Sequence, residues 1–224
     1  MEVPLIEIFS SVQGEGKYVG CRQIFIRFAD CNLRCKYCDT DFERRGQCRI
    51  DDVVDEINRL MSEASIHSIS LTGGEPLIHW EAIRALTERL PGVKIFLETN
   101  GTLVDELERV IDVIDIISMD VKLPHSIERD LFDVHRRFIE AARRKDFYVK
   151  IVVDGETTAE EFTSALEMIS LVSTEIMLIL QPVTPVKNVR AVEPKDILKF
   201  QSTALKYLSD VRVIPQTHRL INVP

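Results

Sequence analysis

Apolar residues along the chain follow two alternating spacings, one typical of β-strands and one typical of α-helices. Residues Gln23 to Ala29 predict a strand, because Ile24, Ile26 and Phe28 fall on one face of it. Residues Asp51 to Ala64 predict a helix from apolar positions spaced three and four apart. The same alternation continues along the chain. It predicts strands at residues 66–71, 94–98, 114–119, 147–153, 175–180 and 211–215, and helices at residues 81–90, 104–110, 127–144, 159–171 and 194–207.

This regular alternation predicts an α/β fold in which parallel strands are joined by right-handed crossovers. The pattern gives about seven strands, fewer than a closed eightfold barrel needs. We therefore expect an open, partial (β/α) barrel with mostly parallel strands. No internal repeat, low-complexity tract or long linker divides the sequence, so we expect residues 1–224 to form one domain.

Polar segments directly follow several of the predicted strands. In parallel α/β barrels the carboxyl ends of the strands build the active site, so we expect these segments to converge on one rim. They comprise residues 31–40, 72–75, 98–101, 118–122 and 181–184.

The composition narrows the classes of function. Hydrophobic residues make up 45% and charged residues 29% of the chain, which is ordinary for a globular protein. The formal net charge of -8 gives no general electrostatic support for binding nucleic acid or an anionic membrane. We find neither a signal segment nor an apolar run of membrane-spanning length, so we expect a cytoplasmic protein without direct nucleic-acid or membrane partners.

A group of cysteines follows the first predicted strand. Cys31, Cys35 and Cys38 fall within eight residues, and their separations suit thiolate ligands on one loop around a metal centre. Three cysteines leave one position open on an iron–sulfur cluster, whereas a structural zinc site needs a fourth ligand. Cys21 or Cys48 could supply that ligand, so the spacing alone leaves both kinds of site open. Disulfides are disfavoured in a cytosolic chain.

A second motif lies at Leu71 to Pro76 and reads Leu-Thr-Gly-Gly-Glu-Pro. Its two glycines allow the backbone to approach a ligand closely, and its proline stops further strand pairing. Together with the CxxxCxxC pattern of the cysteines, the motif resembles the radical S-adenosylmethionine (SAM) superfamily. The resemblance implies that Cys31, Cys35 and Cys38 hold three irons of a [4Fe-4S] cluster, and that SAM chelates the fourth iron.

Two longer stretches narrow the resemblance. Residues Glu7 to Gly16 and Arg27 to Thr40 are similar to the 7-carboxy-7-deazaguanine synthase family, and the similarity extends to His218 and Pro224. It implies a lyase reaction in which a radical ring contraction converts 6-carboxy-5,6,7,8-tetrahydropterin into 7-carboxy-7-deazaguanine with loss of ammonia. The implied cofactors are the [4Fe-4S] cluster, SAM and Mg2+. The product would feed synthesis of queuosine or archaeosine, which are modified bases of transfer RNA.

Roles for individual residues follow from the same resemblance. Thr40 matches a ligand of Mg2+, and Arg27 matches the partner of the substrate carboxylate. The other substrate-binding residues would be Val12, Gln13, Gly14, Glu15, Thr72, His218 and the terminal carboxylate of Pro224. The SAM-binding residues would be Tyr37, Cys38, Asp39, Gly74, Glu75, Ser118, Met119, Asp120, Lys122, Gln181 and Pro182.

Simpler interpretations exist for several of these residues. Gly14 and Gly16 could form only a loop before the first strand, and Arg27 could pair with a neighbouring carboxylate. His218 could be an ordinary exposed histidine.

The resemblance also implies partners, namely a small pterin substrate, a reducing protein such as flavodoxin or ferredoxin, and a second copy of the chain in a homodimer. Two other classes of protein share part of the pattern. A glycyl-radical enzyme activase has CxxxCxxC and the Gly-Gly-Glu-Pro motif but acts on a protein loop. A non-enzymatic binding module would hold zinc with four cysteines.

Overall fold

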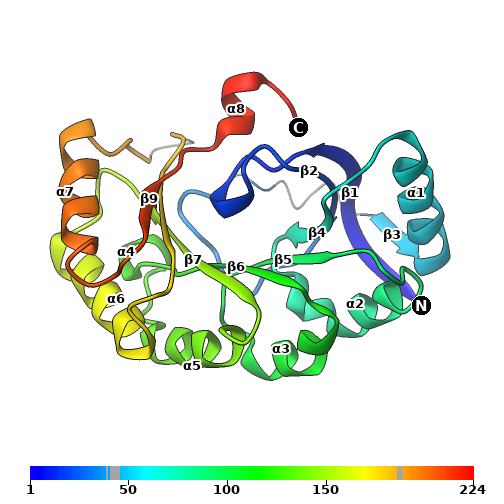
Figure 1. The fold of residues 1–224 in the computed structure, drawn as a ribbon, viewed down its shortest axis with the longest axis horizontal. Helices are drawn as coiled ribbons and strands as arrows, with labels where there is room; N and C mark the ends of the chain where they lie inside the picture. Colours follow the sequence, from blue (N-terminus) through cyan, green and yellow to red (C-terminus); the bar gives the residue numbers. More distant parts are fainter. Residues whose placement is uncertain (39, 41–45, 186–188) are drawn as a thin grey trace.

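The computed structural model describes residues 1–38, 40, 46–185 and 189–224, and its strands form one curved sheet (Figure 1). Within these ranges the sheet has nine strands in the order β3-β1-β2-β4-β5-β6-β7-β8-β9. Among the described residues the two edge strands, β3 (Gly46–Arg49) and β9 (Val211–Val213), do not pair with each other. The open, partial barrel predicted from the sequence is confirmed.

A run of parallel strands begins at β2 (Arg22–Phe28) and continues to β9. The strands between them are β4 (Ser68–Gly73), β5 (Ile95–Thr99), β6 (Ile116–Asp120), β7 (Asp146–Val153) and β8 (Leu178–Pro182). Each corresponds to a predicted strand, with boundaries moved by a few residues. Because these strands are parallel, their carboxyl ends lie along the same edge of the sheet.

Two antiparallel strands at the β3 edge are absent from the sequence-based prediction. In β1 (Glu2–Val12) the buried residues Val3 and Leu5 alternate with less buried ones only at the start, and Pro4 lies between them. Proline within a strand weakens the sequence signal for that strand. β3 is short and polar, so its sequence contains no hydrophobic period.

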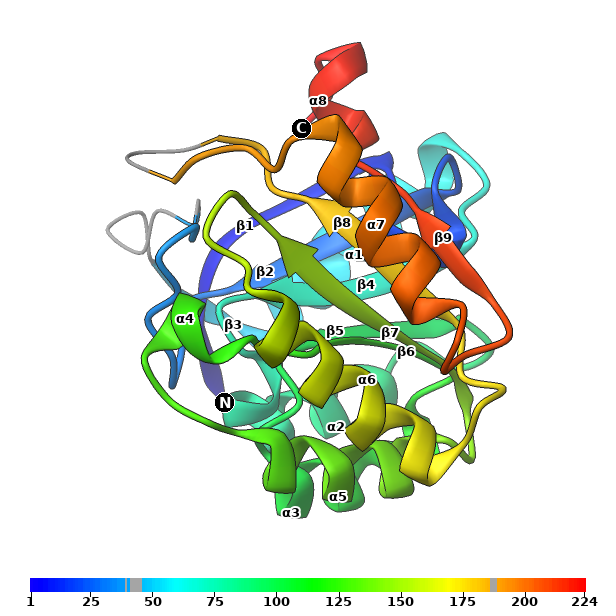
Figure 2. The same ribbon diagram turned by 90° about the vertical axis from the view of Figure 1, so that its left-hand side faces the viewer.

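Helices cover the convex outer face of the sheet (Figures 1 and 2). α1 (Ile50–Glu63) buries one face, which includes Val53, Ile57 and Leu60. The other covering helices are α2 (Trp80–Thr87), α3 (Val104–Val110), α5 (Phe132–Ala142), α6 (Ala159–Val172) and α7 (Pro194–Ala204), with short 3-10 turns at η2 (Pro76–His79) and η3 (Ile111–Val113). The main hydrophobic core lies between these helices and the sheet. Within the described ranges, the helices are too short or too polar to cross a bilayer.

The single helix predicted at residues 127–144 is wrong. The chain forms α4 (Pro124–Ile127) and then α5, and between them Glu128 has a left-handed φ of 57°. A left-handed residue ends a helix by turning the chain away from its axis. α5 begins near Asp130, whose carboxylate accepts a hydrogen bond of 2.8 Å from the backbone N–H of Phe132.

A smaller apolar cluster fills the concave inner face near the amino ends of the strands. It consists of Phe96, Ile116, Tyr148 and Ile179, with Tyr18 of η1 (Gly16–Tyr18) packed against them. Gly16 has a φ of +67°, and a Cβ there would lie 2.3 Å from the Tyr148 hydroxyl oxygen. The close packing of η1 therefore requires glycine and covers this end of the inner face, which leaves the carboxyl ends of the strands accessible.

Candidate active site

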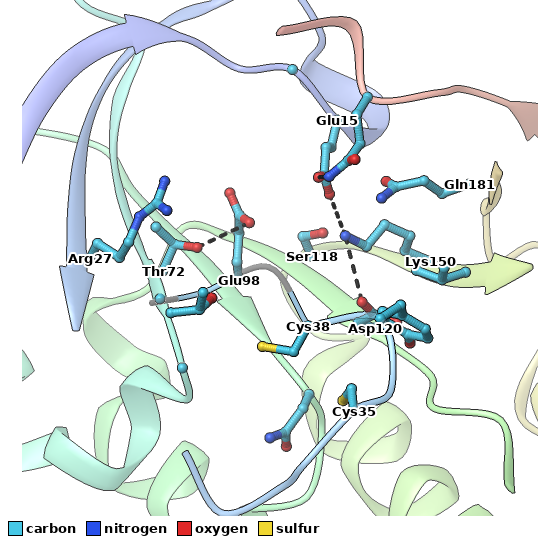
Figure 3. Close-up of a pocket in the computed structure, with 18 of the residues that line it drawn as sticks. Glu15, Arg27, Cys35, Cys38, Thr72, Glu98, Ser118, Asp120, Lys150 and Gln181 are labelled. Carbon is cyan, nitrogen blue, oxygen red and sulfur yellow. Dashed lines mark hydrogen bonds and ion pairs between the residues drawn. The ribbon is translucent and has the colours of Figure 1, made fainter. Parts of the chain in front are cut away.

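The carboxyl ends of the strands surround a cavity of about 250 Å³ (Figure 3). All five polar segments that follow predicted strands contribute to its wall, as expected. The loop after β1 and the C-terminal segment with α8 (Thr217–Ile221) complete it. Of the residues assigned from the sequence, the wall contains Val12, Gln13, Gly14, Glu15, Arg27, Cys31, Cys35, Tyr37, Cys38, Thr40, Thr72, Gly74, Ser118, Asp120, Lys122, Gln181, His218 and Pro224.

The cysteine loop follows β2, and Cys31, Cys35 and Cys38 all line the cavity. Among the described residues, no three His, Cys, Asp or Glu side chains converge closely enough to hold one metal ion. A [4Fe-4S] cluster binds each cysteine through a different iron, so separated thiolates on one loop fit a cluster better than a single zinc ion. Burial raises the pKa of the Cys31 and Cys35 thiols, and ligation to iron would favour their thiolate forms.

The two other cysteines lie away from this loop. Cys21 immediately precedes β2, whereas Cys31 lies beyond the opposite end of that strand. Cys48 lies on β3 and packs against the main core. The cavity wall includes neither of them, so the structure does not support the four-cysteine zinc site. All five cysteines belong to the described residues, and none forms a disulfide.

A buried ion pair lies beside the cysteine loop. The Lys122 ammonium is 2.8 Å from the Asp120 carboxylate and 3.4 Å from the Tyr37 hydroxyl oxygen. Burial opposes the charge of Lys122, but Asp120 outweighs this effect and holds the Lys122 pKa well above its usual range. Lys122 therefore stays protonated and ties Tyr37 to the end of β6. Asp39, also assigned to SAM, lies outside the described residues.

A second ion pair in the same cavity joins Glu15 to Lys150 of β7 (Figure 3). The Gln216 side-chain amide donates a 2.7 Å hydrogen bond to the other carboxylate oxygen of Glu15. Burial alone would raise the Glu15 pKa, but the charge and hydrogen bond of Lys150 lower it to about 2. Glu15 is therefore ionised throughout the physiological pH range. The assignment from the sequence includes neither Lys150 nor Gln216.

Gln13 belongs to a polar network on the inner face of the sheet. Its side-chain amide donates hydrogen bonds to Gln23 at 3.0 Å and to Glu98 at 2.9 Å, and its carbonyl oxygen accepts one from the Glu15 backbone N–H. Glu98 also accepts hydrogen bonds from Ser70 and Thr72. The network fixes the position of Gln13 and of the loop that carries Glu15. Glu98 lines the cavity, and the predicted polar segment 98–101 was the only sequence signal for it.

Arg27 projects from β2 into the same cavity (Figure 3). Its Nε lies 3.3 Å from a Glu7 carboxylate oxygen, and its guanidinium lies 5.5 Å from the centroid of the Phe9 ring. The simpler interpretation, a pair with a neighbouring carboxylate, thus describes one of its contacts. This pair is partly exposed, which leaves the outer edge of the guanidinium able to bind a carboxylate ligand.

Three polar atoms in the cavity wall are buried but make no hydrogen bond within the described part of the chain. They are Arg27 Nε, Asp120 Oδ1 and Gln181 Oε1. Leaving Asp120 Oδ1 or Gln181 Oε1 unsatisfied costs about 1–3 kcal/mol each, whereas Arg27 Nε already has the Glu7 carboxylate 3.3 Å away as an ion-pair partner. Their positions on both sides of the cavity fit the binding of polar ligands there.

The C-terminal segment packs against the loop after β1. The backbone N–H of Thr217 donates a 2.8 Å hydrogen bond to the Gly14 carbonyl oxygen, and Ser11 Oγ donates one of 2.8 Å to a Pro224 oxygen. A Cβ at Gly14 would lie 2.0 Å from His218 Nδ1, so only glycine lets the histidine ring approach this closely. His218 is therefore a component of the cavity wall and not an isolated surface residue.

Three residues assigned to SAM do not line the cavity, namely Glu75, Met119 and Pro182. Glu75 is fully buried, and its carboxylate accepts hydrogen bonds from the Leu77 and Asn100 backbone N–H groups and the Thr99 hydroxyl. Burial raises its pKa to about 7. In this structure Glu75 supports the cavity wall from behind.

Gly73, in the same Leu71–Pro76 motif, also has a structural role. Gly73 has a φ of +117°, and a Cβ there would lie 2.2 Å from the Phe28 carbonyl oxygen. The close contact that requires glycine at this position is therefore with β2.

Comparison of the chain with known protein families and solved structures agrees with the geometry of the site. The Radical SAM superfamily profile matches residues 25–169, which contain four of the five polar segments, including the cysteine loop. In its fold the chain resembles the crystal structure of QueE from Escherichia coli, with a TM-score of 0.65, 21% sequence identity, and 97% of this chain and 95% of that chain covered. The chain belongs to the radical SAM superfamily.

More similar relatives define the family within this class. A 7-carboxy-7-deazaguanine synthase from Geobacter sulfurreducens is 42% identical, with 97% of this chain and 96% of the relative covered. One from Methanothermobacter thermautotrophicus is 36% identical, with 100% and 98% covered. The chain is therefore a member of the 7-carboxy-7-deazaguanine synthase family.

Proposed function

We propose that this chain converts 6-carboxy-5,6,7,8-tetrahydropterin into 7-carboxy-7-deazaguanine with loss of ammonia, as a carbon–nitrogen lyase of deazapurine biosynthesis. One observation carries the proposal. The cysteine loop, Arg27, the Gln13–Glu15 loop and the C-terminal segment all open into the same cavity. Relatives named 7-carboxy-7-deazaguanine synthase match the chain over nearly its whole length.

The cavity has two sides with different chemistry. Cys31, Cys35 and Cys38 would hold the [4Fe-4S] cluster, next to Asp120 and Lys122, which we assign to SAM. When bound, the cluster and SAM supply one-electron chemistry that abstracts a hydrogen atom from the substrate. The chain's own groups position the two ligands and keep water away from them.

On the other side, polar groups match those of a carboxypterin. The Arg27 guanidinium can bind the planar carboxylate through two hydrogen bonds. The ionised Glu15 can accept hydrogen bonds from N–H groups on the guanidine-like edge of the ring. Thr40 offers a hard oxygen and would be the protein's ligand for Mg2+, which would supply a positive charge next to an anionic substrate.

The arrangement favours a small substrate over a protein loop. α8 and its flanking residues lie across the open side of the barrel, where a glycyl-radical activase would need a groove (Figure 1). We also propose that a flavodoxin or ferredoxin supplies the electron, that two copies associate as a homodimer, and that the protein works in the reducing cytoplasm.

The proposal is tested with protein reconstituted anaerobically with iron and sulfide. We expect a brown, oxygen-sensitive protein that, with SAM, Mg2+, a reductant and the carboxypterin, releases ammonia and an ultraviolet-absorbing deazapurine. The Cys35→Ala variant, as a control, should lose both cluster and product. A cluster-loaded wild-type protein that cleaves SAM but yields no deazapurine would disprove the substrate assignment.

A further inference from the structure

Lys150 is a buried lysine whose position the chemistry above does not explain. It lies on β7 and points into the cavity, and its side chain is only 11% exposed (Figure 3). A buried ammonium is costly unless nearby carboxylates compensate its charge. Two carboxylates do so here, because Glu15 forms an ion pair with Lys150 and an Asp120 oxygen lies 3.6 Å from the ammonium.

The two carboxylates depend on Lys150 to different degrees. Asp120 has a closer cation in Lys122, at 2.8 Å. Glu15 receives its other side-chain hydrogen bond from Gln216, which is neutral. Removing the Lys150 charge should therefore change Glu15 more than Asp120. Glu15 lies in the loop that we assign to the substrate, whereas Asp120 lies beside the cysteine loop.

We infer that Lys150 is a positioning residue for substrate recognition. It fixes the orientation of Glu15 and keeps the carboxylate negative, so that the cavity selects a ring edge made of N–H donors. The inference rests on the proposed function for the identity of the ring. A carboxylate has about four lone-pair positions. Lys150 and Gln216 engage one on each oxygen, which leaves the others to accept hydrogen bonds from a ligand.

Other charged or titratable groups near Glu15 and Lys150 come from each neighbouring element. They are Glu98 on β5, Asp120 and Lys122 at the end of β6, Tyr148 on β7, and His218 on α8. With Lys150 present, the pKa of Glu15 is about 2. Without it, burial and the nearby Glu98 and Asp120 would raise the pKa of Glu15, opposed by the Gln216 hydrogen bond and by His218 when protonated.

The test compares the Lys150→Met and Lys150→Arg variants of the cluster-loaded enzyme with Lys206→Met, in which an exposed lysine outside the cavity is replaced. For Lys150→Met we expect the KM for the carboxypterin to rise at least about tenfold, while cleavage of SAM without substrate stays near the wild-type rate. The increase should be larger near pH 6 than near pH 9, because the raised pKa of Glu15 in this variant leaves more of the carboxylate protonated as the pH falls. Lys150→Arg should restore most of the affinity, and Lys206→Met should behave as wild type.

A second measurement does not depend on turnover. The protein is labelled with 13C at glutamate carboxyl groups, and the Glu15 signal is identified by its loss in Glu15→Gln. In the wild type this signal should stay in the ionised form down to about pH 4, whereas in Lys150→Met it should titrate above about pH 4. If wild-type protein makes no deazapurine, the proposed function fails, and this titration still decides the role of Lys150. A KM increase of less than twofold, a pH-independent increase, or an unchanged Glu15 titration in Lys150→Met would overturn the inference.

Discussion

His135 shows how a buried side chain that does not line the cavity supports one that does. It is fully buried on α5, and its Nε2 lies 3.1 Å from the Asn100 carbonyl oxygen. Asn100 lines the cavity, and its backbone N–H donates to Glu75. His135 and Glu75 therefore hold the end of β5 from the core side.

His135 should make folding stability depend on pH. Burial lowers its pKa to about 4, from 6.5 for an exposed histidine, so the unfolded chain binds the proton more tightly. Above about pH 6.5 the full contribution of neutral His135 to the free energy of unfolding is present. As the pH falls from there through about 4, this contribution is lost, by about 3 kcal/mol in total. In urea unfolding at several pH values, His135→Gln should show a weaker dependence over this range. An equally steep dependence in the variant would contradict this assignment.

At the scale of elements, α4 anchors the cysteine loop. The backbone N–H of Lys36, between Cys35 and Cys38, donates a 2.9 Å hydrogen bond to the Ser126 carbonyl oxygen. The preceding residue, His125, lies between Asp154, at 3.1 Å, and Glu161, at 2.8 Å. Because Asp154 follows β7 and Glu161 belongs to the first turn of α6, His125 connects α4 to both elements.

The His125→Leu variant should therefore loosen the cysteine loop without unfolding the barrel. It leaves the Asp154 and Glu161 carboxylates without their shared partner, so we expect a stability loss of about 2–3 kcal/mol and faster loss of iron from the reconstituted protein on exposure to a chelator. Iron release is followed by absorbance, and far-ultraviolet circular dichroism should remain unchanged. Glu160→Gln, which removes an exposed charge from the same helix, serves as the control. Equal iron-release rates in both variants would show that the connection through His125 is unimportant for the loop.

At the scale of the whole molecule, the sheet is open and the C-terminal segment lies across the opening (Figures 1 and 2). α8 buries none of its residues, so it adds little to the hydrophobic core. Its contacts are mainly polar and go to the loop after β1, through Gly14 and Glu15. The segment therefore serves the cavity more than the stability of the fold.

Deleting residues 217–224 should separate these two effects. We expect the melting temperature to fall by no more than about 4 °C, because no buried apolar side chain of α8 is lost. The KM for the carboxypterin should rise at least about tenfold, while SAM cleavage without substrate persists. Calorimetry and steady-state kinetics measure the two quantities. A large fall in melting temperature with an unchanged KM would assign the segment a purely structural role.

Several features could be predicted because they depend on local sequence. The parallel strands and their covering helices follow from short-range apolar periodicity, and the cysteine loop follows from the spacing of Cys31, Cys35 and Cys38. The antiparallel β1 could not be predicted in the same way, since Pro4 interrupts its pattern. The break at Glu128 was also missed, because the apolar positions of α4 and α5 continue in helical phase across it.

The sequence by itself therefore determined the class of fold, the spacing of the cysteine loop and the order of the polar segments, because each depends on residues close together in the chain. Only the tertiary structure decided which charges meet. Lys150 and Glu15 are separated by 135 positions, and no periodicity relates them. They form an ion pair because the curvature of the sheet brings β7 opposite the loop after β1, where burial makes an unpaired charge too costly to keep.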